Sequence, residues 1–244
     1  MWNPIMNIPR SFNSHATSLR ASAVAFAVLV FGGCDTQKPT GPSAAVRPAP
    51  PTSSSEVVDY FNWCWRNRAP DVYSRVLTQD FVFEFASGDS TAVSWKAIPW
   101  GRDDEILSAL HLFEEGTASE PPATSIDLQE TQAVADDPDP LPGHGSKWHR
   151  MLTLQTLLRV NIPGGTWEVR GPAYLFIVRG DSADVPVDLL VQGMKRDSTQ
   201  WWIEHWVDGT LSSATAARVR RSPGPAQTMP RRAFTWGDLK ALYR

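Results

Sequence analysis

The sequence predicts an α+β domain in the order helix, helix, strand, helix and then a run of strands. Three amphipathic segments with apolar residues at helical spacings lie between residues 54 and 116. From residue 126 onward, segments of alternating apolar and polar residues succeed one another and are separated by Gly, Pro and Asp. Because helices and strands are segregated along the chain, we expect helices packed on one face of a mainly antiparallel sheet.

The N-terminal segment has the features of an export signal that ends at Cys34. Its apolar run, Ala21 to Phe31, carries no charge, follows two arginines and is too short to span a hydrocarbon core ~30 Å thick. The ending Gly-Gly-Cys resembles the lipobox of bacterial lipoproteins, in which small residues precede the cysteine that takes up diacylglycerol. The resemblance implies that residues 1–33 are a signal peptide and that Cys34 is lipidated. The alternative is a free thiol that closes an N-terminal membrane helix.

Residues 34–54 are predicted to form a disordered tether. They combine several prolines with Ser, Thr, Gly and Ala, and they show no apolar periodicity that a core could bury. We therefore expect a body held in the bacterial cell envelope by a lipid anchor. The partner membrane is either the inner or the outer one, and the body lies in the periplasm or at the cell surface.

The body is expected to fold without a disulfide. Cys64 is the only cysteine besides Cys34, so stability must come from a core that the 11 Trp and 10 Phe of the chain can supply. Cys64 stands between two tryptophans in a predicted helix, which favours a buried and inert thiol. We assign residues 55–209 to one domain and residues 210–244 to a basic C-terminal extension.

The three predicted helices each have a recognisable start. Ser54 or Ser55 can cap the first, whose inward residues are Val57, Val58, Tyr60, Phe61, Cys64 and Trp65. The second spans Asp71 to Thr78. The third opens after Gly101 with three acidic residues, which the helix dipole favours, and ends at Gly116. Its expected apolar stripe is Ile106, Leu110 and Phe113.

The strands are predicted from period-two alternation. The first is Phe81 to Phe85, and the others are Ile126 to Val134, Trp148 to Val160, Trp167 to Arg179, Val185 to Arg196 and Trp201 to Asp208. We expect Trp148 to Val160 to be the longest, with an apolar face of even-numbered residues. Thr235 can cap a last short helix that runs through Leu242.

Two stretches resemble the nuclear-transport-factor-2-like superfamily, which includes SnoaL-like cyclases and ketosteroid isomerase. They are Val76-Leu77-Thr78-Gln79-Asp80-Phe81-Val82-Phe83, where a helix passes into a strand, and Trp201-Trp202-Ile203-Glu204-His205-Trp206-Val207-Asp208, a closing strand. The resemblance covers residues 55–209. It implies a cone-shaped fold, with three N-terminal helices packed on a curved, mainly antiparallel sheet and a pocket at the wide end.

The family's catalytic groups do not carry over to this chain. The tyrosine and the aspartate of the isomerase align with Phe61 and Phe85, which can neither donate nor accept a proton. We therefore expect a non-catalytic domain that binds a small apolar ligand or an envelope protein. The alternative is a small-molecule lyase, isomerase or cyclase that uses Tyr60, His205 or Asp208.

The candidate pocket residues are Tyr60, Trp63, His111, His205 and Asp208. Strict alternation along the last strand places His205 with Trp201, Ile203 and Val207, on its more apolar side, which favours a structural histidine. Asp208 ends the strand and can start a turn. His111, between two leucines, is expected on the flank of the third helix.

No metal or cofactor is expected from the sequence. His144 and His149 lie near Asp136, Asp137 and Asp139, but the histidines straddle the start of a strand and the carboxylates belong to a flexible loop. Gly143-His144-Gly145 lacks the strand-to-helix context of a phosphate loop.

Charge is unevenly distributed along the chain. Residues 34–210 hold 14 Lys and Arg against 25 Asp and Glu, whereas residues 211–244 hold 7 against 1. This basic tail either lies along the acidic surface of its own body or contacts anionic lipid or a cell-wall polymer. Nucleic acid is not an expected partner.

Overall fold

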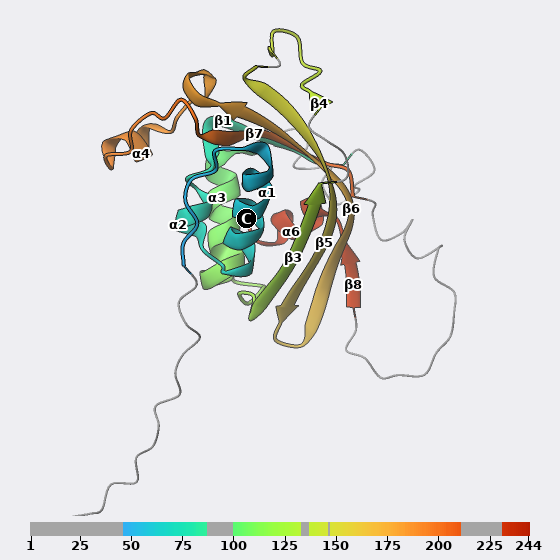
Figure 1. Ribbon diagram of the computed structural model, residues 1–244. Helices are drawn as coiled ribbons and strands as arrows, with labels where there is room; N and C mark the ends of the chain where they lie inside the picture. The colour runs from blue at the N-terminus through green and yellow to red at the C-terminus, as the bar shows by residue number, and fades with distance from the viewer. Residues whose placement is uncertain (1–45, 87–99, 133–136, 146, 211–230) are drawn as a thin grey trace, which may run out of the picture. The chain divides into compact units, whose positions relative to one another are not determined.

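The computed structural model describes residues 46–86, 100–132, 137–145, 147–210 and 231–244 (Figure 1). The predicted signal peptide, Cys34 and the tether up to residue 45 lie outside these residues. None of the helices described is both long and apolar enough to cross a bilayer.

The predicted α+β class is confirmed. Helices α1, α2 and α3 cover the concave face of a curved, mainly antiparallel sheet, and the C-terminal helix α6 lies between these helices and the sheet (Figure 1). The main core fills this space with buried side chains from α1, α2, α6 and every long strand. The layers are therefore those that the resemblance implies, with an additional helix inside.

Helix α1 (Ser54–Arg66) forms where it is predicted, but its cap is Ser53 rather than Ser54 or Ser55. Ser53 caps it, since the Ser53 hydroxyl accepts a hydrogen bond from the Glu56 N–H, and the predicted inward residues are all buried. Helix α2 (Pro70–Tyr73) is shorter than predicted. Val76 lies outside the helix, directly before a strand, and its carbonyl accepts a hydrogen bond from the Ile203 N–H at 2.7 Å.

Helix α3 (Arg102–Leu110) continues into a π-helical turn, η2 (His111–Glu115), that Gly116 ends with a φ of 71°. The predicted apolar stripe is partly wrong. Phe113 is buried, but Ile106 and Leu110 are only partly buried, and Glu105 is in the core instead. The apolar pattern does not predict the buried face of α3, because Glu105 lies on that face.

The sheet runs in the order β2-β1-β7-β6-β5-β3. These strands are β2 (Trp100–Gly101), β1 (Leu77–Glu84), β7 (Trp201–Asp208), β6 (Gly165–Arg179), β5 (His149–Ile162) and β3 (Ser125–Gln132). Two short strands are added: β4 (Asp137–Pro138) pairs with β5, and β8 (Arg231–Phe234) pairs with β6. Neighbours are antiparallel except β1–β7 and β6–β8, which are parallel.

The predicted hairpin of β5 and β6 forms the longest strand pairing of this sheet. The even-numbered residues Leu152, Leu154, Leu158 and Val160 are buried, as the alternation of β5 predicts. The longest strand is nevertheless β6, with 15 residues against 14 in β5.

The predicted strand Val185 to Arg196 is wrong. This segment contains helix α4 (Val187–Val191), which follows the 3₁₀ turn η3 (Gly180–Ser182). Val185 and Leu189 pack with Trp202 and Val178 in a second, smaller cluster. Of the apolar residues that suggested a strand, Val185 and Leu189 are thus buried, whereas Val187 and Val191 on α4 are exposed.

The edge strand β3 is closed by helix α1. The Asn62 side chain donates to the Glu130 carbonyl at 3.0 Å and accepts from the Glu130 N–H at 2.9 Å, while the Arg66 guanidinium donates to the Leu128 carbonyl at 2.6 Å. These bonds satisfy edge groups that would otherwise be free to pair with another strand.

The C-terminal residues belong to the body rather than to an extension that begins at residue 210. Thr235 caps α6 (Trp236–Leu242), as predicted, and Trp236, Leu239 and Tyr243 are buried in the main core. At the other end, Pro51 is buried and its carbonyl accepts from the Trp201 N–H at 2.9 Å. The last residues of the predicted tether are therefore held by the sheet.

Candidate functional site

Large side chains fill the space around α6, between the helical layer and the sheet. The Trp236 ring lies 4.9 Å from that of Trp65 on α1 and 4.7 Å from that of Trp206 on β7, measured between centroids. All three rings are buried. The C-terminal helix thus joins the helical layer to the sheet by direct aromatic packing.

A buried ion pair lies beside these rings. The Lys240 ammonium pairs with both carboxylate oxygens of Glu105, and it lies 4.1 Å from the centroid of the Trp206 ring. Glu105 also accepts from the Tyr73 hydroxyl at 2.8 Å and from the Trp100 Nε1 at 3.0 Å. Burial lowers the pKa of Lys240, and the charge of Glu105 opposes this change. A carboxylate with these partners serves as a structural anchor.

Three of the predicted pocket residues have structural partners on separate elements. The Tyr60 hydroxyl donates to the Val72 carbonyl at 3.1 Å, and burial raises its pKa to about 12. Trp63 is partly buried against the core. His111 places Nδ1 2.8 Å from the Tyr243 carbonyl oxygen, at the end of the chain.

Asp208 holds the start of the C-terminal helix. Its carboxylate accepts from the Thr210 N–H at 2.8 Å, from the Thr210 hydroxyl at 2.5 Å and from the Gly237 N–H at 3.0 Å. The side chain is buried. Its geometry is that of a helix-capping group, so the structure does not unite Tyr60, His205 and Asp208 in one open site.

His205 lies at an irregularity of strand β7. The pairing with β6 shifts by one residue, so that Phe176 is opposite His205 whereas Ile177 is opposite Ile203. Ile203 and Trp206 consequently both reach the main core, and His205 leaves the side that strict alternation assigns to it. Its ring stacks on Phe176 at 4.9 Å, and burial lowers its pKa.

The same irregularity brings Glu204 into a cluster with Asp139, His144 and His149. One atom that can bind a metal from each of these four side chains lies within 4.8 Å of the corresponding atom of every other. The shortest separations are 2.7 Å from His144 Nδ1 to Asp139 Oδ2 and 2.9 Å from His149 Nδ1 to Glu204 Oε1. The two imidazole rings stack at 4.1 Å with an angle of 28° between their planes.

The backbone explains why these four residues meet. Strand β4 pairs Asp137 with Met151 and Pro138 with Arg150, so Asp139 follows directly beside the start of β5 at His149. A tight turn returns the chain at His144, whose N–H donates to the Leu141 carbonyl at 3.1 Å. The expectation that the histidines and the loop carboxylates remain apart is therefore wrong for Asp139, whereas Asp136 lies outside the described residues.

The sequence pattern does not predict Glu204 as a site residue. Alternation places it with Trp202 and Trp206, which suggests an ordinary polar position on a strand. One sequence feature could have identified Glu204. It is a carboxylate flanked by apolar residues in Trp-Trp-Ile-Glu-His-Trp, where an unpaired charge would be costly. The cluster opens on a pocket of about 260 Å³, lined by Asp80, Val82, Leu141, His144, Glu204 and His205.

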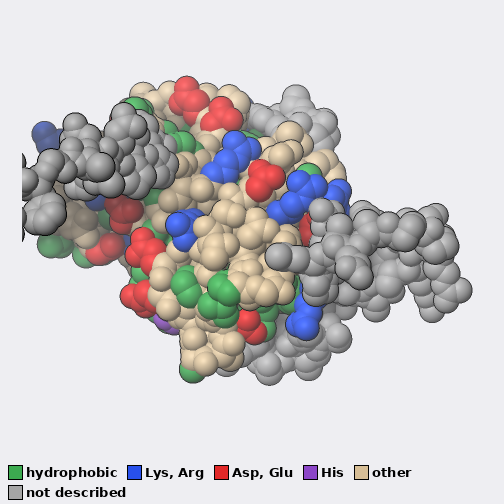
Figure 2. All heavy atoms as spheres, turned by 90° about the horizontal axis from the view of Figure 1, so that it is seen from below, with side chains coloured by type: hydrophobic (Ala, Val, Ile, Leu, Met, Phe, Trp, Pro, Cys, Tyr) green, Lys and Arg blue, Asp and Glu red, His purple; other side chains and the backbone are tan. Residues whose placement is uncertain are grey.

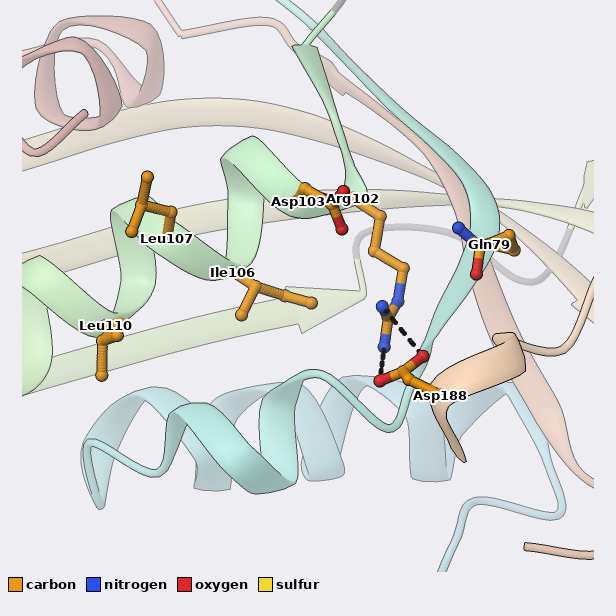
Figure 3. A pocket seen from close by; sticks show the side chains of 7 residues that line it. All are labelled: Gln79, Arg102, Asp103, Ile106, Leu107, Leu110 and Asp188. Carbon is orange, nitrogen blue, oxygen red and sulfur yellow. Dashed lines mark hydrogen bonds and ion pairs between the residues drawn. The ribbon is translucent and has the colours of Figure 1, made fainter. Parts of the chain in front are cut away.

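A second hollow, which we call the α3 groove, lies along helix α3. It has a volume of about 480 Å³ and is lined by Gln79, Arg102, Asp103, Ile106, Leu107, Leu110 and Asp188 (Figure 3). Figure 3 shows the apolar side chains Ile106, Leu107 and Leu110 along the helix, and Arg102 paired with Asp188 at its N-terminal end. In this ion pair, Arg102 Nη1 lies 3.3 Å from Asp188 Oδ1.

The charged surface is mixed rather than segregated on the face seen in Figure 2. Acidic and basic side chains alternate among the coloured residues of that face. Part of the predicted basic tail is neutralised by the body, because Lys240 pairs with Glu105 and Arg244 pairs with Asp104 at 2.9 Å. The Arg244 pair agrees with the intramolecular interpretation, whereas Lys240 is buried in the core, and residues 211–230 lie outside the description.

No protein-family profile and no curated protein matches the chain. Among solved structures, a conserved protein from Planctomyces limnophilus is similar at 13% identity and a TM-score of 0.43, covering 64% of this chain and 93% of its own. A Novosphingobium aromaticivorans protein, provisionally named a scytalone dehydratase, has 10% identity and a TM-score of 0.41, with 63% and 78% covered. A domain of unknown function with a cystatin-like fold from Nostoc punctiforme has 11% identity and a TM-score of 0.39, with 68% and 82% covered. These similarities concern the fold alone.

Proposed function

We propose that the protein is an exported, lipid-anchored envelope module whose body binds a partner and does not catalyse a reaction. The anchor is proposed from the export signal and the Gly-Gly-Cys ending at Cys34. The role of the body is proposed from its interior. Around α6, aromatic rings and a buried ion pair fill the space between the helices and the sheet, which supports a packed interior rather than a substrate cavity there.

The predicted catalytic residues support the same proposal. General acid–base catalysis needs groups that converge on one substrate atom within hydrogen-bond reach. Tyr60 is bound to the Val72 carbonyl, and Asp208 is bound to Thr210 and Gly237. Each of these groups has a structural task on its own element.

The α3 groove is the surface that we assign to the partner. Leu107 is 42% exposed there, and the neighbouring helix α4 exposes Val187 and Val191 by 63% and 82%. Apolar side chains at this exposure lose contact with water when another surface covers them, which favours association. An apolar segment of a neighbouring envelope protein fits a long, open groove better than a small ligand, which would be bound in an enclosed cavity.

Complementation of a deletion strain tests this proposal. Cys34→Ser should move the protein from the membrane to the soluble fraction, since it removes the acylated thiol. Leu107→Glu should abolish the cellular phenotype without lowering the melting temperature, because it places a charge in the α3 groove. Val46→Glu, at an apolar residue that is 90% exposed on another segment, is the matched control and should complement fully.

Two further variants separate binding from catalysis. Tyr60→Phe and His205→Gln should both complement, since neither residue lies in the α3 groove. Loss of the phenotype in either variant, with membrane attachment and melting temperature at wild-type values, would instead support the lyase or isomerase interpretation.

A further inference from the structure

We propose that Asp139, His144, His149 and Glu204 form a binding site for a divalent transition-metal ion such as Zn²⁺. We call these four residues the His–carboxylate cluster. The inference goes beyond the proposed binding function and does not depend on it, because the cluster and the α3 groove share no lining residue.

The first argument is geometric. Ligand atoms about 2.0 to 2.2 Å from one tetrahedral zinc ion are roughly 3.3 to 3.6 Å apart. In the cluster, the atoms that can bind a metal lie within 4.8 Å of one another, and one intermediate separation, from His144 Nδ1 to Glu204 Oε1, is 3.7 Å. The two shortest pairs are nearer than an ion would hold them, so metal binding requires only small rotations of side chains that already face a common point.

The second argument concerns burial and charge. The Asp139 side chain has no exposed surface, and those of His149 and Glu204 are only 13% and 15% exposed. Two carboxylates so close together and so withdrawn from water repel each other unless positive charge lies between them. Shared protons can supply this charge through the imidazole–carboxylate hydrogen bonds, and a divalent cation can supply it in their place.

The third argument is rigidity. Three of the four ligands lie on or directly beside strands of the sheet: Asp139 follows β4, His149 begins β5 and Glu204 is at the irregular position of β7. The fourth, His144, is in the turn after Asp139. Asp139 is fixed further, because its Oδ1 accepts the Leu141 N–H at 2.8 Å while its Oδ2 faces His144. Oriented carboxylates of this kind are a common feature of metal sites.

The donor set indicates the class of ion. Two imidazole nitrogens and two carboxylate oxygens suit Zn²⁺ and its neighbours in the first transition row, whereas Mg²⁺ and Ca²⁺ prefer sites made entirely of oxygen. His144 and Glu204 also line the 260 Å³ pocket. A bound ion would therefore be open to water or to a small ligand from that side.

Zinc titration of the full-length chain tests the site. After treatment with a chelator and dialysis, the protein should bind one equivalent of Zn²⁺ in isothermal titration calorimetry, and elemental analysis should find the same stoichiometry. Glu204→Gln removes one anionic ligand while it keeps the size of the side chain. It should weaken zinc binding by about tenfold or more.

The matched control is Glu115→Gln. Glu115 also lies beside a histidine, with 3.8 Å between His111 Nε2 and its carboxylate, but outside the cluster. This variant should bind zinc as the wild type does. If Glu204→Gln fails to fold, as circular dichroism would show, His144→Gln takes its place, because His144 is the most exposed ligand at 28%.

Three outcomes would overturn the proposal. The first is the absence of saturable zinc binding by the folded wild type. The second is unchanged affinity in a folded ligand variant. The third is an equal loss of affinity in Glu115→Gln, which would assign the binding to scattered surface carboxylates.

Discussion

Lys240 connects the last helix to the first half of the chain through one buried contact. Its ammonium lies against Glu105 and the Trp206 ring, and both charged side chains are at most 2% exposed. A buried pair of this kind contributes little net stability, because each charge loses its hydration. Removing one partner is much more costly, since it leaves the other charge uncompensated.

We therefore predict a strongly non-additive double-mutant cycle at this pair. Lys240→Met alone should lower the free energy of unfolding by about 3 to 5 kcal/mol, because Glu105 then remains buried without its counterion. Lys240→Met combined with Glu105→Gln should recover at least half of that loss. Urea unfolding of the single and double variants measures these free energies. Additive losses would show that the two charges do not depend on each other.

Glu130 is a second buried carboxylate, on strand β3, and it has no counterion like that of Glu105 within the described residues. Its Oε1 accepts the Thr156 hydroxyl at 2.6 Å, while its Oε2 is buried without a hydrogen-bond partner. Burial raises its pKa from 4.5 to about 8, and the nearby charge of Asp208 adds to this change. The folded protein thus holds a proton on Glu130 at pH values where the unfolded chain has released it.

The linkage predicts that stability falls as pH rises through this window. The contribution of Glu130 is fully present below pH 4.5 and is lost progressively up to about pH 8, with a total on the order of 4 kcal/mol. Glu130→Gln cannot ionise, so it should gain stability relative to the wild type between pH 5 and pH 9, and most of the gain should appear by pH 8. Urea midpoints at several pH values measure the difference.

Glu168→Gln provides a control with the opposite sign. Hydrogen bonds from Arg170 and Arg159 lower the pKa of Glu168. Its contribution is present above pH 4.5 and is lost as pH falls through the lower value. This variant should therefore be less stable than the wild type at neutral pH, and the gap should close in acid. If the stabilities of the wild type and Glu130→Gln changed with pH in parallel, Glu130 would not be held protonated in the folded protein.

At the scale of elements, helix α6 is a component of the core. Trp236 touches both the helical layer and the sheet, and Leu239 and Tyr243 are buried beside it. We predict that Trp236→Ala lowers the free energy of unfolding by about 3 to 5 kcal/mol, because the cavity it leaves is bounded by two layers that cannot collapse together.

Val191→Ala serves as the control for Trp236→Ala in thermal and urea unfolding. Val191 lies on the short helix α4 and is 82% exposed, so its truncation should change stability by less than about 0.5 kcal/mol. A loss below about 1 kcal/mol for Trp236→Ala would contradict the central position of α6.

The elements that were predicted well are those whose periodicity is local. Helix α1 and strands β5 and β7 carry clear patterns, and the capping signal at Thr235 is sufficient to identify α6. The errors have tertiary causes. The Val76 carbonyl bonds to Ile203 of β7, and Val185 and Leu189 are buried in a second cluster beside a short helix. Glu105 is buried because it pairs with Lys240 from the other end of the sequence.

At the scale of the whole molecule, the sequence identifies the layers but not the site. Two of the four residues of the His–carboxylate cluster, His144 and His149, attract attention by their type, and Asp139 by its place near them. What unites them with Glu204 is a one-residue irregularity in the pairing of β7 with β6, which no alternation pattern reveals. The basic charge of residues 231–244 is likewise not all on the surface, because Lys240 is buried in the core and paired with Glu105.

The late position of α6 has a consequence for how the protein matures. Ribosomes deliver the chain from its N-terminus, yet the centre of the core is completed by residues 236–243. Helices α1 to α3 and the long hairpin can begin to associate earlier, but the space between them stays unfilled until residues 236–243 follow. A chain truncated before residue 236 should therefore remain sensitive to protease, whereas the chain that includes residues 236–243 becomes resistant within one cooperative step.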